Sequence, residues 1–154
     1  MTDKSAAAWG SLPILAHVHA SGDWAFFTWA GLREAEDVYA VRLDGSTPPE
    51  RLTTGADHYS IRDVSPDGMR LILGQSRNSC EHDHLLLLDR STGALTQLTP
   101  EQSSHYVYGG IFSADGQDVI FTANFDYEAG EVTLGGWVWR QSLATGARRC
   151  LARS

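Results

Sequence analysis

One short stretch of the chain concentrates side chains that bind metal ions, Cys80-Glu81-His82-Asp83-His84. Alternate residues of an extended strand share a face, so Cys80, His82 and His84 would lie together there. A thiolate and two imidazoles are ligands that zinc accepts. At alternate positions, however, the three would spread over about 13 Å of strand and would need a bulge or tight turn to converge. The competing interpretation is a polar loop that leads into a strand at 85–88.

The elements around this stretch belong to an internal repeat. Ser65-Pro66-Asp67-Gly68 precedes one apolar run, and Ser113-Ala114-Asp115-Gly116 precedes another, with an offset of 48 residues from Ser65 to Ser113. Ser21-Gly22-Asp23-Trp24 fits the same frame more loosely, 44 residues before Ser65. Proline presets φ for a turn, aspartate bonds the neighbouring backbone, and glycine accepts positive φ. Each copy therefore predicts a hairpin turn.

Every copy continues in the same order, with a second apolar run, a turn and a short closing segment. The closing segments are Arg51-Leu52-Thr53, Gln97-Leu98-Thr99 and Arg149-Cys150-Leu151. With the apolar piece before each Ser-x-Asp turn, each copy offers four short strands. Four strands in a repeat of this length indicate an all-β fold of β-propeller blades. A β-sandwich with shared turn residues is the alternative, but a sandwich has no reason to repeat the order of its strands and turns.

We therefore expect one β-propeller segment at 1–154, made of three four-stranded antiparallel blades. Blade 1 covers about 16–53, blade 2 about 61–99 and blade 3 about 108–151. Four histidines lie on or shortly before the predicted innermost strands, which line the central channel of a propeller. His17 and His19 share a face of one such strand, while His58 and His105 each fall shortly before one. They are candidates for contact with a ligand, the alternative being hydrogen-bonded side chains of a watered channel.

The second copy resembles a known family. Val64 to Leu73 reads Val-Ser-Pro-Asp-Gly-Met-Arg-Leu-Ile-Leu and is similar to the Pro-Asp type of WD40-like repeat. That repeat occurs in TolB-like periplasmic proteins and in the N-terminal propellers of prolyl oligopeptidase-family (S9) serine peptidases. The resemblance covers about Ala16 to Leu151. It is weaker in the first copy, which lacks the proline, and in the third, which has Ala114 in its place.

The resemblance implies a substrate-gating lid over a separate α/β-hydrolase domain. Such a domain carries a Gly-x-Ser-x-Gly nucleophile turn, which this sequence does not contain; the nearest serine, Ser76, lacks the second glycine. We therefore expect no catalytic residue and no enzymatic activity in this chain, although a longer parent could be a serine peptidase. No cofactor is expected.

Composition and charge limit the partners. The net charge of -7 and the sequence pI of about 5.2 disfavour nucleic acid and anionic membranes. Met1 to Gly10 is too weakly apolar for a signal peptide, and no apolar run approaches the length of a bilayer span. We expect a cytoplasmic protein.

Three blades are fewer than the four to eight that close a propeller. We therefore expect two uncovered faces and one of several partners: the remaining blades, an α/β-hydrolase domain, or a second copy that completes a six-bladed dimeric ring. The first function hypothesis is a non-catalytic scaffold and substrate-gating module. A stand-alone TolB-like protein-interaction module is the second, and a small binder of metal or ligand is the third.

Overall fold

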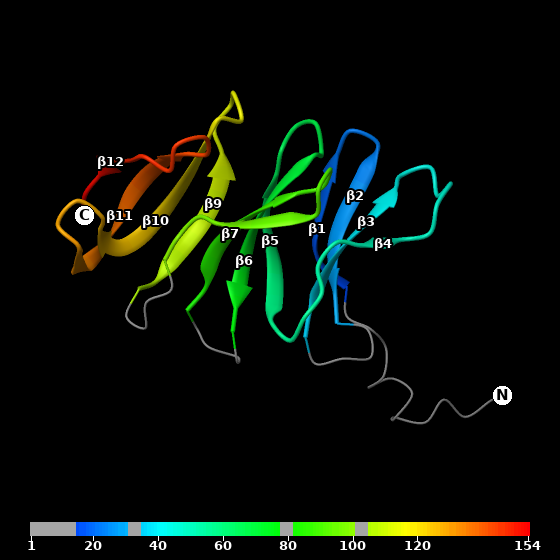
Figure 1. The fold of residues 1–154 in the computed structure, drawn as a ribbon, viewed down its shortest axis with the longest axis horizontal. Helices are drawn as coiled ribbons and strands as arrows, with labels where there is room; N and C mark the ends of the chain where they lie inside the picture. The colour runs from blue at the N-terminus through cyan, green and yellow to red at the C-terminus, as the bar shows by residue number, and fades with distance from the viewer. Residues whose placement is uncertain (1–14, 31–34, 78–81, 101–104) are drawn as a thin grey trace.

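The computed structural model describes residues 15–30, 35–77, 82–100 and 105–154, and its regular structure in these ranges is entirely β. Twelve strands of these ranges form three four-stranded sheets, and Figure 1 shows the sheets side by side. Adjacent strands are antiparallel in every sheet. The described part of the chain contains no helix with the length and apolarity needed to cross a bilayer. The predicted all-β class with three four-stranded blades is confirmed.

Each blade uses four consecutive strands in chain order. Blade 1 contains β1 (Leu15–Ser21), β2 (Trp24–Trp29), β3 (Asp37–Arg42) and β4 (Glu50–Arg51). Blade 2 contains β5 (His58–Val64), β6 (Arg70–Ser76), β7 (His84–Asp89) and β8 (Ala94–Gln97). Blade 3 contains β9 (Val107–Phe112), β10 (Asp118–Asp126), β11 (Glu131–Ser142) and β12 (Arg148–Ala152). The first strands of the blades are neighbours, since β1 packs against β5 and β5 against β9.

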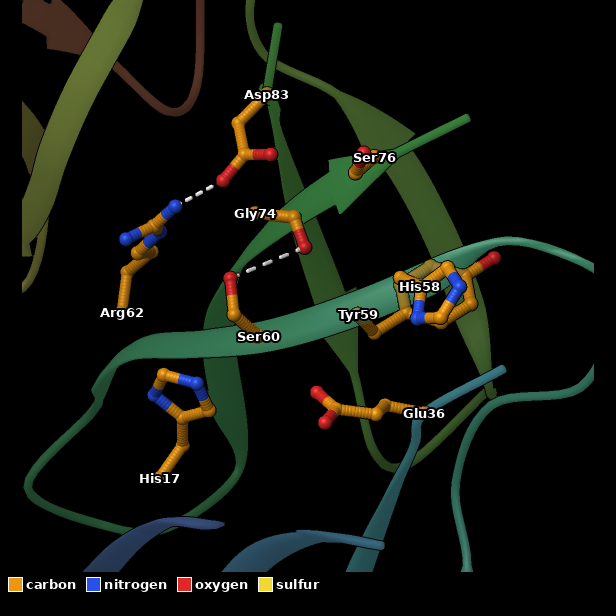
Figure 2. A pocket seen from close by; sticks show the side chains of 9 residues that line it. All are labelled: His17, Glu36, His58, Tyr59, Ser60, Arg62, Gly74, Ser76 and Asp83. Atoms are coloured by element: carbon orange, nitrogen blue, oxygen red, sulfur yellow. Dashed lines mark hydrogen bonds and ion pairs between the residues drawn. The ribbon is translucent and has the colours of Figure 1, made fainter. Parts of the chain in front are cut away.

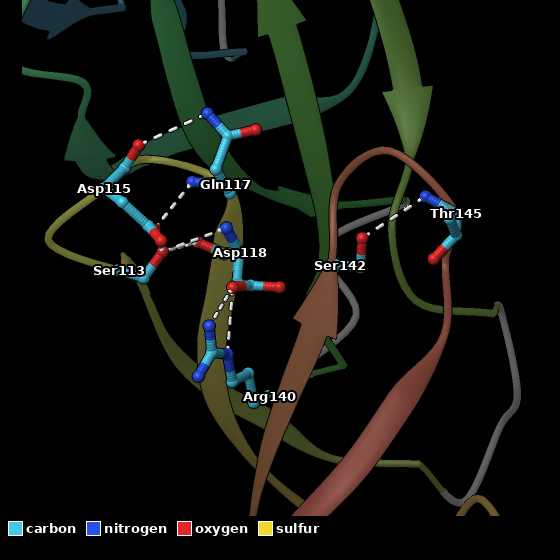
Figure 3. A network of polar contacts seen from close by, with 7 residues as sticks. All are labelled: Ser113, Asp115, Gln117, Asp118, Arg140, Ser142 and Thr145. Carbon is cyan, nitrogen blue, oxygen red and sulfur yellow. Dashed lines mark hydrogen bonds and ion pairs between the residues drawn. The ribbon is translucent and has the colours of Figure 1, made fainter.

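The Ser-x-Asp-Gly turns have the same hydrogen bonds in blades 2 and 3. The hydroxyl of Ser65 donates to Asp67 at 2.6 Å and accepts from the backbone N–H of Arg70 at 2.9 Å. In blade 3, Ser113 donates to Asp115 at 2.6 Å, and its hydroxyl accepts from the N–H of the residue that begins β10 at 3.0 Å (Figure 3). The serine hydroxyls lower the pKa of both aspartates. The repeat seen in the sequence is therefore a repeated turn structure.

Blade 1 closes its first hairpin differently. Ser21 pairs directly with Trp24, so Gly22 and Asp23 alone form the turn, and Gly22 has a φ of 55°. The Ser21 hydroxyl donates instead to the carbonyl oxygens of Ser65 at 2.8 Å and Pro66 at 2.9 Å. This serine therefore ties blade 1 to the turn of blade 2.

The Leu-Thr endings close the outer part of blades 1 and 2. Thr53 is buried and its hydroxyl accepts from the backbone N–H of Val38 at 2.9 Å. Thr99 is also buried and accepts in the same way from Leu85 at 2.9 Å. Each threonine hydroxyl accepts from a buried backbone N–H group that lies just beyond the paired residues of the two outer strands. This shared role explains why the Leu-Thr endings repeat.

Two apolar cores lie between the blades. The first joins blade 1 to blade 2 and contains Phe26, Val38, Ala40, Tyr59, Ile61, Leu71, Leu73, Leu86 and Leu88. The second joins blade 2 to blade 3 and contains Ile72, Leu85, Leu98, Val107, Val119, Phe121, Ala123, Phe125 and Trp139. Along β6 the side chains alternate, with Leu71 and Leu73 facing blade 1 and Ile72 facing blade 3. Blade 2 is therefore covered on both faces, while blades 1 and 3 each cover one face of it.

Polar contacts supplement these cores. The Arg90 guanidinium lies 4.2 Å from the centre of the Trp24 ring and donates to the carbonyl of Gly68 at 3.0 Å. Asp63 of β5 accepts from the backbone N–H of Phe112, at the end of β9, at 2.8 Å. The inner strands of blades 2 and 3 are therefore hydrogen-bonded to each other through a side chain.

Candidate functional site

A polar pocket of about 250 Å³ opens between blades 1 and 2, beside their innermost strands. Figure 2 shows side chains from β1, β5 and β6 and from the segments before β3 and β7 around it. The lining residues are His17, Glu36, His58, Tyr59, Ser60, Arg62, Gly74, Ser76 and Asp83. The pocket therefore combines two imidazoles, a guanidinium, two carboxylates and hydroxyl groups.

The alternation of β5 directs one row of side chains into this pocket. His58, Ser60 and Arg62 are alternate residues and line it together. Gly74 lies opposite Ser60 in the β5–β6 ladder. A Cβ at Gly74 would lie 2.7 Å from Arg62 Nε and 2.7 Å from Ser60 Oγ. The missing side chain of Gly74 therefore provides the space in which Arg62 lies across the sheet.

Arg62 is held by an ion pair with Asp83, which precedes β7. Its Nε atom is buried and has no hydrogen-bond partner among the described residues. The Ser60 hydroxyl donates to the carbonyl of Gly74 at 3.4 Å, not to an imidazole. The geometry therefore positions a guanidinium and a hydroxyl for binding, and it does not activate Ser60 as a nucleophile.

His17 enters the pocket because β1 is irregular. Ala16 pairs with Thr28 and His19 with Phe26, so two residues of β1 lie opposite one residue of β2. This is a β-bulge, and His17 in it has a φ of 50°, a left-handed conformation that is uncommon outside glycine. The bulge interrupts the strict alternation that the sequence pattern implied for His17 and His19. His17 lines the pocket, whereas His19 is not among its lining residues.

His105 lies elsewhere, in the interface between blades 2 and 3, and is fully buried. Its Nδ1 is 3.3 Å from the carbonyl oxygen of Pro100, and its Nε2 is 2.6 Å from the hydroxyl of Tyr127. Its ring also packs against the Phe125 ring at 5.0 Å. Burial lowers the pKa of His105, while the hydrogen bond to the Pro100 carbonyl acts in the opposite direction. Of the four histidine candidates, the structure brings only His17 and His58 into one pocket.

The predicted zinc ligands are only partly visible. Cys80 lies outside the described residues. His82 packs against the Tyr106 ring at 4.2 Å, and His84 begins β7 and is buried. Nδ1 of each imidazole is buried with no hydrogen-bond partner in the described part of the chain. Within that part, no group of three or more His, Cys, Asp or Glu side chains is arranged to hold a metal ion. The Cys80, His82 and His84 site stays a prediction.

The sequence reasoning did not select Ser60, Arg62 or Gly74. One signal could have found two of them, because Ser60 and Arg62 follow His58 at the two-residue period of a strand. No local signal identifies Gly74, whose place in the pocket depends on the pairing of β6 with β5.

Comparisons with known proteins bear on the fold. The sequence matches no protein-family model and no curated protein. TolB of Agrobacterium tumefaciens matches at a TM-score of 0.66 with 17% identity, over 86% of this chain and 43% of that one. TolB of Acinetobacter baumannii matches at 0.64 with 21% identity, over 90% of this chain and 32% of that one. The β-propeller domain of the Trilobed protease of Pyrococcus furiosus matches at 0.65 with 9% identity, over 92% of this chain and 44% of that one.

These similarities support a β-propeller type of fold. The chain spans less than half the length of each of the three structures. It is therefore similar to a set of propeller blades.

Proposed function

We propose that this chain is a non-catalytic segment of a β-propeller that serves as a scaffold and gates the access of substrates to a partner domain. The proposal combines the blade architecture with the Pro-Asp repeat of Val64 to Leu73, which resembles the propellers of prolyl oligopeptidase-family peptidases. Its partners would be an α/β-hydrolase domain and the blades that complete the ring, from the same protein or from a second copy.

The observation that carries the proposal is the polar pocket beside the inner strands. In a propeller the inner strands surround the channel, so a molecule that passes along them meets His17, His58 and Arg62. Blade 2 is anchored on both sides of this row. The N–H of Tyr59 donates to the Glu36 carbonyl of blade 1 at 3.0 Å, and Asp63 accepts from blade 3. A rigid wall with polar groups suits selection of molecules better than it suits their chemical conversion.

Two measurements test the proposal. The purified chain should release no product from aminoacyl or acyl-peptide substrates, and appreciable turnover would overturn the non-catalytic assignment. The reading frame that contains this sequence should also encode more Ser-Pro-Asp-Gly repeats or a hydrolase domain with Gly-x-Ser-x-Gly. A reading frame that encodes neither further repeats nor a hydrolase domain would contradict the gating role.

A TolB-like protein-interaction module is the second candidate. It is supported by the two TolB structures, which match at TM-scores of 0.66 and 0.64. The same reading frame separates the two candidates, because an interaction module needs no hydrolase domain.

A further inference from the structure

Among the described residues, blades 1 and 3 each have one sheet face that packs against no other blade. On blade 3, the side chains that alternate with the core residues point away from blade 2. We call this surface the C-face, and its apolar residues are Ile111, Ile120, Val138 and Leu151. Arg140, which pairs with Ile120, lies on the same face. On blade 1, the corresponding outward surface is the N-face, which consists of Ala25, Phe27, Trp29, Tyr39 and Val41. Both surfaces follow from the strand registers and from the residues that form the two inter-blade cores.

The C-face is equivalent to the face of blade 2 that blade 3 covers. Gly74 pairs with Leu85 as Thr122 pairs with Val138, so Val138 is equivalent to Leu85. Ile120 is likewise equivalent to Ile72, and Leu151 to Leu98. Blade 3 covers these blade 2 residues: Leu98 is 5% exposed, whereas its equivalent Leu151 is 49% exposed.

The N-face is equivalent to the surface of blade 3 that covers these blade 2 residues. Phe27 pairs with Tyr39 on β2 and β3, as Phe121 pairs with Trp139 on β10 and β11. Phe121 and Trp139 are core residues that blade 3 packs against blade 2. The rings of Phe27 and Tyr39 are stacked at 5.7 Å on the outward side of blade 1. An aliphatic C-face and an aromatic N-face are therefore the same pair of surfaces that already form the blade 2–blade 3 interface.

We propose that the C-face of this chain binds the N-face of a second copy, and that the same contact is repeated by a twofold rotation. Two copies then form a closed ring of six blades, which lies within the four to eight of known propellers. Each copy supplies an aliphatic surface to the aromatic surface of the other. Burial of the apolar residues of these two faces provides the driving force for association. This inference goes beyond the proposed gating function, because it identifies a second copy as the partner that completes the ring of blades.

The first test is the mass of the purified chain in solution. Light scattering across a dilution series should give twice the 16.8 kDa of the single chain. A monomer at every concentration would overturn the inference. The proposed gating function would remain open in that case, because it depends on the activity assay and on the reading frame.

The second test uses one substitution on each face. Leu151→Arg on the C-face and Phe27→Glu on the N-face should each give a monomer, because either change damages both contacts of the ring. Leu95→Arg is the matched control, since Leu95 is also exposed but lies on β8 of the central blade and outside both faces. The control should remain a dimer, and circular dichroism should show the same β content in all variants. If Phe27→Glu does not fold, Val41→Glu probes the same face.

Mixing the two face variants distinguishes this ring from other dimers. In the mixture one intact C-face meets one intact N-face, so a heterodimer should form although each variant alone is monomeric. If the dimer joined two C-faces, the Phe27→Glu variant alone would remain a dimer. If it joined two N-faces, the Leu151→Arg variant alone would remain a dimer. Either result, or a mixture that stays monomeric, would overturn the inference.

Discussion

The hydroxyl of Tyr127 donates a hydrogen bond to Nε2 of His105 across 2.6 Å in the interface between blades 2 and 3. The direction follows from the other ring nitrogen. His105 Nδ1 faces the carbonyl oxygen of Pro100, which can only accept, so Nδ1 carries the proton and Nε2 accepts. Burial also raises the pKa of Tyr127, which keeps its hydroxyl protonated. In the neutral imidazole each ring nitrogen therefore has a hydrogen-bond partner.

This pair makes stability depend on pH. Burial lowers the pKa of His105. The hydrogen bond to the Pro100 carbonyl acts in the opposite direction, while His84, Arg148 and His82 add to the lowering. An unfolded histidine titrates near pH 6.5, so below about that pH the unfolded state binds more protons than the folded state. The stabilisation is complete above about pH 6.5 and decreases as the pH falls. Urea unfolding of wild type between neutral and mildly acidic pH should show this loss.

The variant His105→Leu tests whether His105 causes this pH dependence of stability. Its free energy of unfolding should depend less on pH than that of wild type, whatever its value at neutral pH. Thr54→Val is the control, because it lies at an exposed position and removes no titratable group. Equal pH dependence in wild type and His105→Leu would contradict the role of His105.

Gly74→Ala should destabilise the protein and displace Arg62. The added Cβ would lie 2.7 Å from Arg62 Nε and from Ser60 Oγ, closer than such contacts allow. Gly136→Ala is the matched control, since it is also a strand glycine but its Cβ would have no neighbour within 4 Å. Chemical denaturation should show a lower midpoint for Gly74→Ala and little change for Gly136→Ala. A neutral Gly74→Ala variant would show that the pocket rearranges easily.

Thr53→Val and Thr99→Val should each lower the free energy of unfolding by about 1–3 kcal/mol, because each leaves a buried backbone N–H without its acceptor. The two effects should add in the double variant, since the threonines lie in different blades and share no partner. Thr54→Val, at an exposed position, is the control. Urea titrations of the four variants and wild type measure these differences. A near-zero loss would mean that another group satisfies the N–H groups.

Asp63→Ala should loosen blade 3 from blade 2. The carboxylate accepts from the N–H groups of both Val64, at 2.9 Å, and Phe112, at 2.8 Å. Asp63→Asn keeps one carbonyl acceptor and should lose less stability than Asp63→Ala. Hydrogen exchange at the Phe112 amide should accelerate in Asp63→Ala more than in Asp63→Asn. Equal exchange in both variants would show that this hydrogen bond does not join the blades.

Much of the fold was predictable because its signals are local. The turns of Ser65 to Gly68 and Ser113 to Gly116 depend on hydroxyl and carboxylate groups within a few residues, and their hydrogen bonds repeat as the sequence does. The strand periods likewise depend on neighbouring residues. Less of the candidate site was predictable, since Arg62 lies in the pocket only because Gly74, on another strand, lacks a side chain.

The sequence by itself therefore determined the three blades, their turns and the alternation that creates an apolar surface on each side of every sheet. Only the tertiary structure decided which histidines meet. The bulge of β1 places His17 in the same pocket as His58, whereas the packing of blade 3 buries His105 against Tyr127. The physical reason is range: turns and strand periods depend on residues that are close in the chain, but pockets and interfaces depend on how separate sheets approach one another.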